Sequence, residues 1–104
     1  MESFMKKHFL DVLRNIDNKA RSNQRQMAKD LGFSIGKINY CLKKLKEKGL
    51  IKMKSFQNNP NKINYMYVLT PKGVEEKIKL TANFMKRIMK EYDDLQKELK
   101  KNKK

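Results

Sequence analysis

The strongest constraint on the fold is an unbroken heptad pattern in the last third of the sequence. Its positions alternate at steps of four and three, and Thr81 is their one polar member: Val74, Ile78, Thr81, Met85, Ile88, Tyr92, Leu95 and Leu99. Such spacing predicts one α-helix with a coiled-coil seam. Thr70 as cap and Pro71 in the first turn would begin this helix. It would then be about 43 Å long up to Leu99, at ~1.5 Å per residue.

A chain of 104 residues allows one domain of ordinary size. Such a domain cannot bury so long a helix by itself, so the seam predicts a partner, most simply a second copy of the chain. The alternative is a helix that folds back on its own domain. The spacing does not distinguish parallel from antiparallel pairing. We expect residues 74–104 to form a coiled-coil dimerisation helix with a basic tail.

Two helices and a tight turn are predicted before residue 50. Asn23 and Gln26 have the spacing of a capping box before a short helix. Gly32 and Gly49 suit the left-handed position that follows a helix. Ser34 would cap the longer helix between them, whose inward residues are Ile35, Ile38, Leu42 and Leu45. A short helix, a glycine-containing turn and a longer helix are typical of a helix-turn-helix.

A further helix is predicted at the start of the chain, with Ser3 as its cap and its end near Asn18. Its apolar stripe comprises Phe4, Met5, His8, Phe9, Val12, Leu13 and Ile16. Residues 50–57 and 62–69 are rich in β-branched and aromatic residues and flank the turn composition of residues 58–61, which predicts a β-hairpin. The expected fold is therefore mainly α with a β-hairpin wing, a winged helix-turn-helix over residues 1–73 with a long C-terminal helix.

The net charge of +15 predicts a polyanionic partner. Residues 34–73 carry nine cations against Glu47 as their one anion, net +8, so this charge is concentrated on the third helix and the hairpin. The N-terminal part of the second helix of a helix-turn-helix enters the major groove of DNA. The candidate DNA-binding residues are Ser34, Gly36, Lys37, Asn39, Tyr40, Lys43, Lys44, Lys54 and Lys62.

These candidates have different expected roles. Lys37 can donate to guanine or phosphate, Tyr40 can contact a phosphate or a base edge, and Gly36 permits close approach. Ser34 and the free N–H groups of the helix start can hold a phosphate. A solvated lysine face without a ligand, an RNA-binding role for Tyr65 and Tyr67, and a protein-interaction module that docks its partner through the last helix remain as alternatives.

The composition argues against several other classes. One histidine and one cysteine, without a glycine-rich phosphate loop, do not favour an enzyme, a cofactor or a metal site. His8 is expected to be a packed or half-exposed helix residue. Cys41 is expected to be a buried, inert thiol, with a redox sensor as the alternative. The apolar runs are too short for a membrane span, and Lys6 and Lys7 interrupt any signal-peptide pattern.

Two segments resemble the small MarR-type winged-helix regulators associated with exopolysaccharide (EPS) gene clusters. They are the Ser-x-Gly-Lys-x-Asn-Tyr-Cys-Leu run at 34–42 and Leu-Thr-Pro-Lys-Gly at 69–73, within a similarity that covers roughly residues 9–99. The resemblance implies a bacterial, cytoplasmic regulator of transcription that acts at the nucleoid. We expect a homodimeric repressor, with an exopolysaccharide cluster as a candidate target.

The sequence departs from the broader MarR pattern at two points. The wing lacks the Asp-x-Arg signature, and Asn61 and Lys62 stand in that region. The extra helices that shape the MarR dimer and its ligand pocket are also missing from the sequence. We therefore do not carry the binding of a small-molecule effector over from the MarR proteins, and we expect dimerisation to depend mainly on the last helix.

Overall fold

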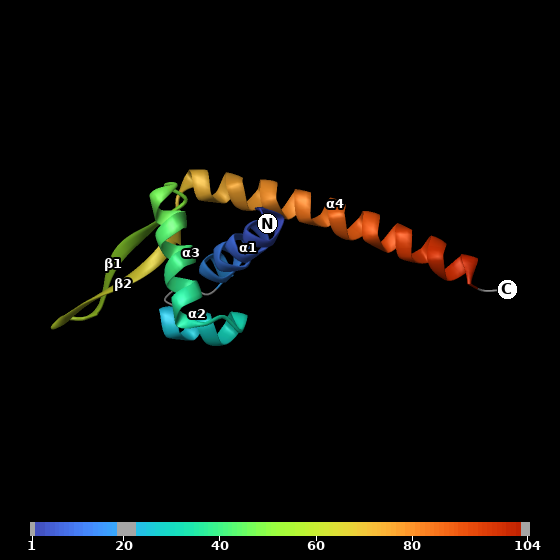
Figure 1. The fold of residues 1–104 in the computed structure, drawn as a ribbon. Helices are drawn as coiled ribbons and strands as arrows, with labels where there is room; N and C mark the ends of the chain where they lie inside the picture. The colour runs from blue at the N-terminus through green and yellow to red at the C-terminus, as the bar shows by residue number, and fades with distance from the viewer. Residues whose placement is uncertain (1, 19–22, 103–104) are drawn as a thin grey trace.

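The computed structural model describes residues 2–18 and 23–102, and the side chains of residues 6–18, 23–57 and 59–102. The elements follow the chain in the order α1 (Glu2–Asn18), α2 (Gln24–Leu31), α3 (Ile35–Glu47), β1 (Ile51–Asn59), β2 (Lys62–Leu69) and α4 (Pro71–Lys101) (Figure 1). The predicted winged helix-turn-helix with a long C-terminal helix is confirmed. Helix α1 already includes Ser3, so the prediction that Ser3 precedes the helix as its cap is wrong. The side chains of Phe4 and Met5, and the tail residues Lys103 and Lys104, lie outside the described part.

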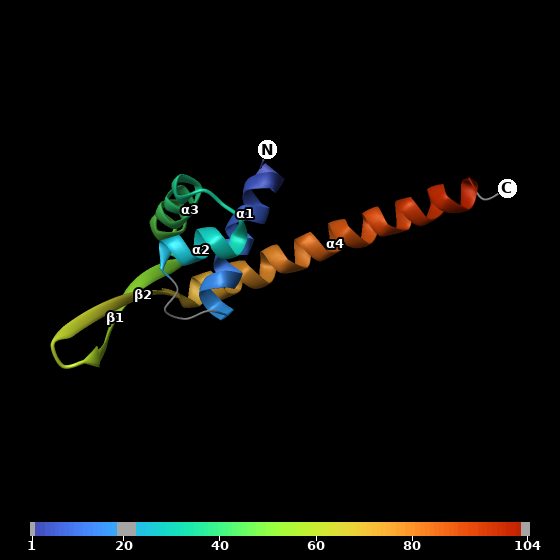
Figure 2. The same cartoon turned by 90° about the horizontal axis from the view of Figure 1, so that it is seen from below.

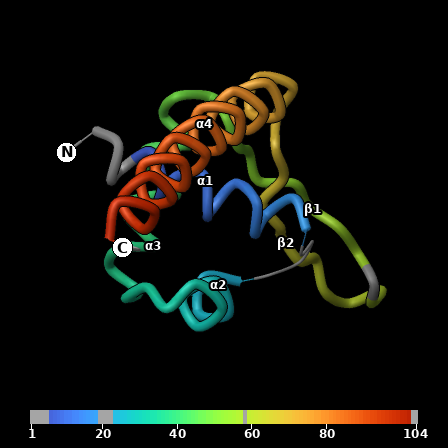
Figure 3. The backbone as a smooth tube through the Cα atoms, turned by 90° about the vertical axis from the view of Figure 1, so that its right-hand side faces the viewer, coloured from blue at the N-terminus to red at the C-terminus, as the bar shows by residue number. Residues whose placement is uncertain are grey.

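Helix α1 is the centre of the core. It lies between α4 and α2, as the views in Figures 1 and 3 agree, and it also contacts α3 and β2. Val12, Leu13 and Ile16 are buried as predicted, and Phe9 packs against the core. Leu10, which lies outside the predicted stripe, is buried too, because α4 covers a second side of α1. The apolar surface of α1 is therefore wider than a single stripe.

The predicted start of α2 is half correct. Asn23 Oδ1 accepts a hydrogen bond from the Gln26 backbone N–H at 2.7 Å, which satisfies one of the free donors of the first turn. The Gln26 side chain, however, donates to Asp30 Oδ1 at 2.8 Å instead of reaching back to Asn23. The reciprocal half of the predicted capping box is therefore wrong. Gly32 ends the helix with φ 69°, as expected.

A tight corner joins the end of α3 to the start of α4. Gly49 has φ 73°, and the Leu50 N–H donates to the Leu45 carbonyl at 2.9 Å, which completes the predicted Schellman motif. The Leu50 carbonyl accepts a hydrogen bond from the Thr70 N–H at 3.0 Å. The Thr70 hydroxyl donates to the Gly49 carbonyl at 2.6 Å and accepts from the Gly73 N–H at 3.0 Å. This corner fixes the direction in which α4 leaves the domain.

The wing is an antiparallel hairpin in which Ile51 pairs with Leu69 and Ser55 pairs with Tyr65. Strand β1 extends to Asn59, so the connection is shorter than the predicted loop over 58–61 and consists of residues 60–61. The pairing is irregular between Phe56 and Asn59. The Asn59 side chain accepts a hydrogen bond from the Asn61 N–H at 3.0 Å, which stabilises this tight turn.

Helix α4 packs on the domain only through its first turns. Gly73 and Leu80 are buried, and Phe84 lies partly buried against the core. Figure 2 shows the rest of the helix extending away from the domain, and every residue from Met85 to Asn102 is exposed. The molecule is consequently 71 Å long but only 26 Å and 23 Å across. The predicted alternative, a helix folded back on its own domain, does not hold beyond Phe84.

No helix in the described ranges is long and apolar enough to cross a membrane.

Candidate nucleic-acid interface

Helix α3 begins with a capped N-terminus, and several residues of its first turns are exposed to solvent. Ser34 has an extended backbone, and its Oγ accepts the Lys37 N–H at 3.1 Å. Its hydroxyl hydrogen is still available to donate, for example to a phosphate. Gly36 and Asn39 are exposed on the same turns. The structure therefore brings the predicted cap, the glycine and the amide together at the end of the helix that a helix-turn-helix offers to DNA.

The buried face of α3 begins later along the helix than predicted. Ile38, Leu42 and Leu45 are buried, whereas Ile35 is 45 % exposed, so its predicted core position is wrong. Ile35 belongs to the first turn of α3 and borders a surface hollow with Asn23 at the start of α2. Among the described residues, no element buries it at this edge of the domain.

The middle of α3 carries an exposed aromatic and cationic surface. Tyr40 is 47 % exposed, and Lys44 Nζ lies 5.8 Å from the centre of its ring. Lys44 is also 3.7 Å from Glu47 in an exposed ion pair, which contributes little to stability. Lys43 is exposed next to them. All four residues can reach a ligand that approaches α3 from outside the domain.

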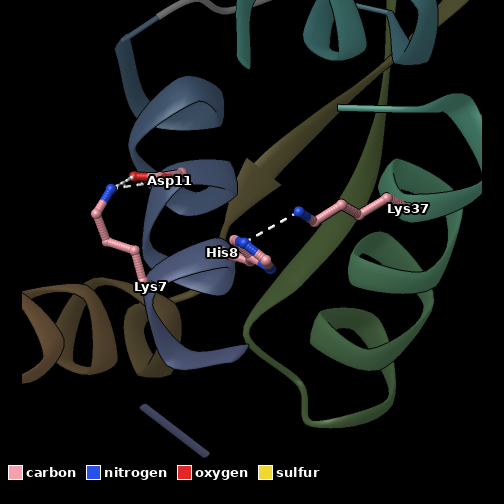
Figure 4. Close-up of polar contacts among 4 residues, drawn as sticks. All are labelled: Lys7, His8, Asp11 and Lys37. Atoms are coloured by element: carbon pink, nitrogen blue, oxygen red, sulfur yellow. Dashed lines mark hydrogen bonds and ion pairs between the residues drawn. The ribbon is translucent and has the colours of Figure 1, made fainter. Parts of the chain in front are cut away.

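Lys37 is placed differently from the expectation of an outward side chain. Its Nζ lies 3.0 Å from His8 Nε2 on α1 (Figure 4). The same Nζ lies 4.1 Å from the centre of the Phe33 ring. The His8 ring packs edge-on against the same Phe33, with ring centres 5.1 Å apart. The ammonium group of Lys37 therefore lies where α1 and α3 pack together, and not on the outer surface of α3.

Burial and two neighbouring lysines, Lys37 and Lys7, lower the pKa of His8. Burial is the largest cause, because it disfavours the charged imidazolium, and the positive charges of the lysines add repulsion. The neutral ring can accept a hydrogen bond from the Lys37 ammonium, which matches the short contact between them. Sequence reasoning missed this pair, since 29 positions separate the two residues and no local pattern links them.

The wing lysines share one face of the hairpin. Side chains alternate along a strand, and paired residues point to the same side. Lys52 and Lys54 pair with Val68 and Met66, and Lys62 has the same parity on β2. All three lysines are exposed. The opposite face contains Met53, Tyr65 and Tyr67, of which Tyr67 packs on the core and Tyr65 is 63 % exposed.

Cys41 is fully buried in α3, and burial raises the pKa of its thiol, an effect that the charge of Lys37 only partly opposes. We expect iodoacetamide at neutral pH to alkylate Cys41 much more slowly in the folded protein than in urea, because the reactive thiolate is both rare and inaccessible. Mass spectrometry over a time course measures both rates. Equal rates would support the redox-sensor alternative.

The described residues contain no group of three or more His, Cys, Asp or Glu side chains that could hold a metal ion.

Comparison with known families agrees with this geometry. Residues 10–52 match a family described as winged helix-turn-helix DNA-binding. This segment runs from α1 to the start of β1 and includes all of α2 and α3. No curated protein matches the chain. The described fold and the family match agree on a winged helix-turn-helix DNA-binding domain.

Several solved structures share the fold. Lactococcus lactis ZitR, described as a zinc-responsive MarR family member, is 26 % identical, with a TM-score of 0.58 over 86 % of this chain and 58 % of that one. Streptococcus pneumoniae FabT in complex with DNA is 23 % identical, with a TM-score of 0.57 over 86 % and 59 %. A variant of S. aureus MepR is 22 % identical, with a TM-score of 0.60 over 92 % and 74 %.

The chain thus spans less than two thirds of the length of ZitR and FabT. The resemblance to MarR-type proteins is confirmed at the level of the fold and its DNA-binding segment. The association with exopolysaccharide clusters stays a prediction.

Proposed function

We propose that this chain is a homodimeric regulator of transcription that binds double-stranded DNA in a sequence-specific manner. The observation that carries the proposal is the exposed start of α3, where the Ser34 cap, Gly36, Asn39 and Tyr40 lie together within a winged helix-turn-helix DNA-binding domain. In this arrangement the start of α3 reads bases in the major groove, while lysines on α3 and the wing contact phosphates.

The distribution of charge supports a duplex as the ligand. Lys43 and Lys44 on α3, together with Lys54 and Lys62 on one face of the wing, carry positive charge on two elements that follow each other in the chain. Glu47 is the one acidic residue between Ser34 and Gly73. A groove-binding helix flanked by a basic wing suits the phosphates on either side of a major groove.

The homodimer is supported by the exposed seam of α4. Ile78, Met85, Tyr92 and Leu99 are each more than half exposed, although all are apolar or aromatic. A helix in a protein gains most of its stability from tertiary packing, and the described residues of α4 after Phe84 are all exposed. A stripe of exposed apolar residues of this length marks an interaction surface.

The charges on α4 favour a second copy as the occupant of that surface. In the heptad frame, the cations between Met85 and Lys101 all fall at positions remote from the seam, and they are Lys86, Arg87, Lys90, Lys97, Lys100 and Lys101. The positions beside the seam are Met89, Glu91, Gln96 and Glu98. Two strongly basic chains can therefore pair along α4 without bringing lysines together across the interface.

The direction of regulation and the target genes are inferred from the resemblance of residues 34–42 and 69–73 to the MarR-type regulators of exopolysaccharide clusters. That resemblance supports a repressor, acting in the bacterial cytoplasm on an exopolysaccharide gene cluster. A symmetric dimer would recognise a palindrome with half-sites about 34 Å apart, or a multiple of that distance.

Selection from a pool of random duplexes tests the proposal. We expect the protein to enrich a palindromic sequence and to prefer it over shuffled duplex and over structured RNA of equal length. Preference for the RNA would favour the RNA-binding alternative. Failure to retain any duplex at low salt, combined with capture of a protein partner through α4, would favour the interaction module.

Replacing Lys43 by Ala should weaken binding to all duplexes alike and make it less sensitive to salt. Each phosphate contact releases condensed counterions, so the slope of log K against log salt should fall by about two, one for each protomer. Fluorescence anisotropy at several salt concentrations measures the slope. Lys97→Ala, on the far half of α4, removes the same charge and should leave the slope unchanged; an equal change in both variants would contradict the assignment.

A further inference from the structure

The contact between His8 and Lys37 links α1, the central helix of the core, to α3, the helix proposed to bind DNA. His8 is buried, whereas Lys37 stands in the first turns of α3, three residues after the Ser34 cap. Figure 4 shows the Lys37 side chain reaching from α3 toward the His8 ring on α1. The contact needs a neutral ring, because an imidazolium has no free lone pair to accept the ammonium proton.

We propose that His8 is a positioning residue for the DNA-reading helix: it holds the Lys37 ammonium against α1 in the free protein, and Lys37 leaves it to contact the duplex. The proposal rests on the proposed DNA-binding function. Lys37 has a long, flexible stem, so rotation of its side chain can carry the ammonium from the Phe33 ring toward the outer surface of α3 without moving the backbone.

Charged groups on both helices determine how His8 responds. Lys37 on α3 and Lys7 on α1 disfavour the imidazolium, while Asp11 on α1 favours it. Asp11 is itself held by Lys7 Nζ, at 2.8 Å and 3.0 Å from its two carboxylate oxygens. The Cys41 thiol, also on α3, is buried and stays neutral because its pKa is raised. Lys37 is therefore the group whose departure upon DNA binding would change the charge around His8.

The consequence is a link between protons and DNA. When Lys37 moves to the duplex, His8 loses a positive neighbour, so its pKa rises in the complex. The complex then binds more protons than the free protein, and affinity must increase as the pH falls through the interval between the two pKa values. A rise of one pKa unit would tighten binding by up to about tenfold. Protonation of His8 would also expel Lys37 from its resting place in the free protein.

His8 is the one histidine of the chain, so its ring signals in NMR spectra can be assigned without ambiguity. The experiment titrates His8 in the free protein and in the complex with the selected duplex, and measures duplex affinity between pH 5.5 and 7.5. The variants are Lys37→Met and, as the matched control, Lys43→Met, which removes the same charge from the outer face of the same helix.

We expect the His8 pKa to rise in the wild-type complex, and to rise already in free Lys37→Met but not in free Lys43→Met. Affinity of the wild type and of Lys43→Met should increase toward low pH, whereas Lys37→Met should lose most of this dependence. His8→Gln, which keeps an acceptor but cannot titrate, should lose it as well.

Two results would overturn the proposal. One is an unchanged His8 pKa on DNA binding, and the other is the same pH dependence in Lys37→Met and Lys43→Met. If no duplex is bound at any pH, the proposed function fails and the release of Lys37 fails with it. The comparison of His8 pKa values in the free variants would then still decide whether His8 holds Lys37 at rest.

Discussion

Replacing Ile88 by Asp should convert the proposed dimer into a monomer and weaken binding to a duplex with two half-sites by about 10²–10⁴-fold. Ile88 lies in the middle of the exposed seam of α4, with its side chain 48 % exposed in the single chain. In a dimer, the new carboxylate would be buried among apolar side chains with no partner, which is strongly unfavourable. A monomer binds one half-site at a time and loses the gain from linking two binding modules.

Analytical ultracentrifugation measures the first effect, since the dimer has twice the 12.4 kDa mass of the chain. Lys97→Asp is the matched control, because it introduces the same carboxylate on the same exposed helix at a heptad position remote from the seam. We expect that variant to remain dimeric. If Ile88→Asp is still a dimer, the seam does not form the interface, and the two copies must associate through another surface.

Replacing Gly73 by Ala should lower the free energy of unfolding by at least about 2 kcal/mol, as expected for an overpacked site. A Cβ at position 73 would overlap the Leu50 carbonyl oxygen and lie 2.9 Å from the Leu50 carbonyl carbon. These are backbone atoms that the hydrogen bond from Thr70 holds in place. Neither α4 nor the end of α3 can move away without breaking the corner that joins them, so the gain in helix propensity from Ala does not compensate.

The control for this change is Gly36→Ala. Gly36 also lies inside a helix, but the nearest atom to a Cβ there is Ser34 Oγ, at 4.0 Å. This variant should therefore be stabilised by up to about 1 kcal/mol, while the added methyl group weakens DNA binding if α3 approaches the duplex at this point. Thermal unfolding at one fixed protein concentration measures both variants, and Gly73→Ala should melt about 10 °C or more below the wild type. Similar melting temperatures would show that the corner can adapt.

The features predicted correctly from the sequence are mainly local. The Asn23 and Ser34 caps, the left-handed Gly32 and Gly49, and the start of α4 at Pro71 each depend on a few neighbouring residues. The free backbone N–H and C=O groups at helix ends need hydrogen-bond partners close by, so a few neighbouring residues are enough to predict these positions. These helix bounds predict the helix-turn-helix, and within α3 the apolar spacing then predicts the face that buries Ile38 and Leu42.

The features that sequence reasoning missed depend on how elements pack. Burial of Leu10 and Leu80 requires knowing that α4 crosses α1, and the exposure of Ile35 requires knowing that no described element buries this side chain. The placement of Lys37 is the clearest example. A helical projection points it outward, but its long side chain bends back to His8 on another helix. A projection describes where a side chain leaves the helix, and not where its charged end lies.

In the proposed homodimer, the corner at Leu50, Thr70 and Gly73 would make α4 set the distance between the two helices that contact DNA. Because the corner fixes the angle between α4 and α3, the pairing register of two α4 helices determines how far apart the two reading helices lie. A slip of one heptad would shift one of them by about 10 Å, at ~1.5 Å per residue, which is close to three base pairs. In that dimer the spacing of the two half-sites would therefore depend on the seam of α4, whose residues contact no base.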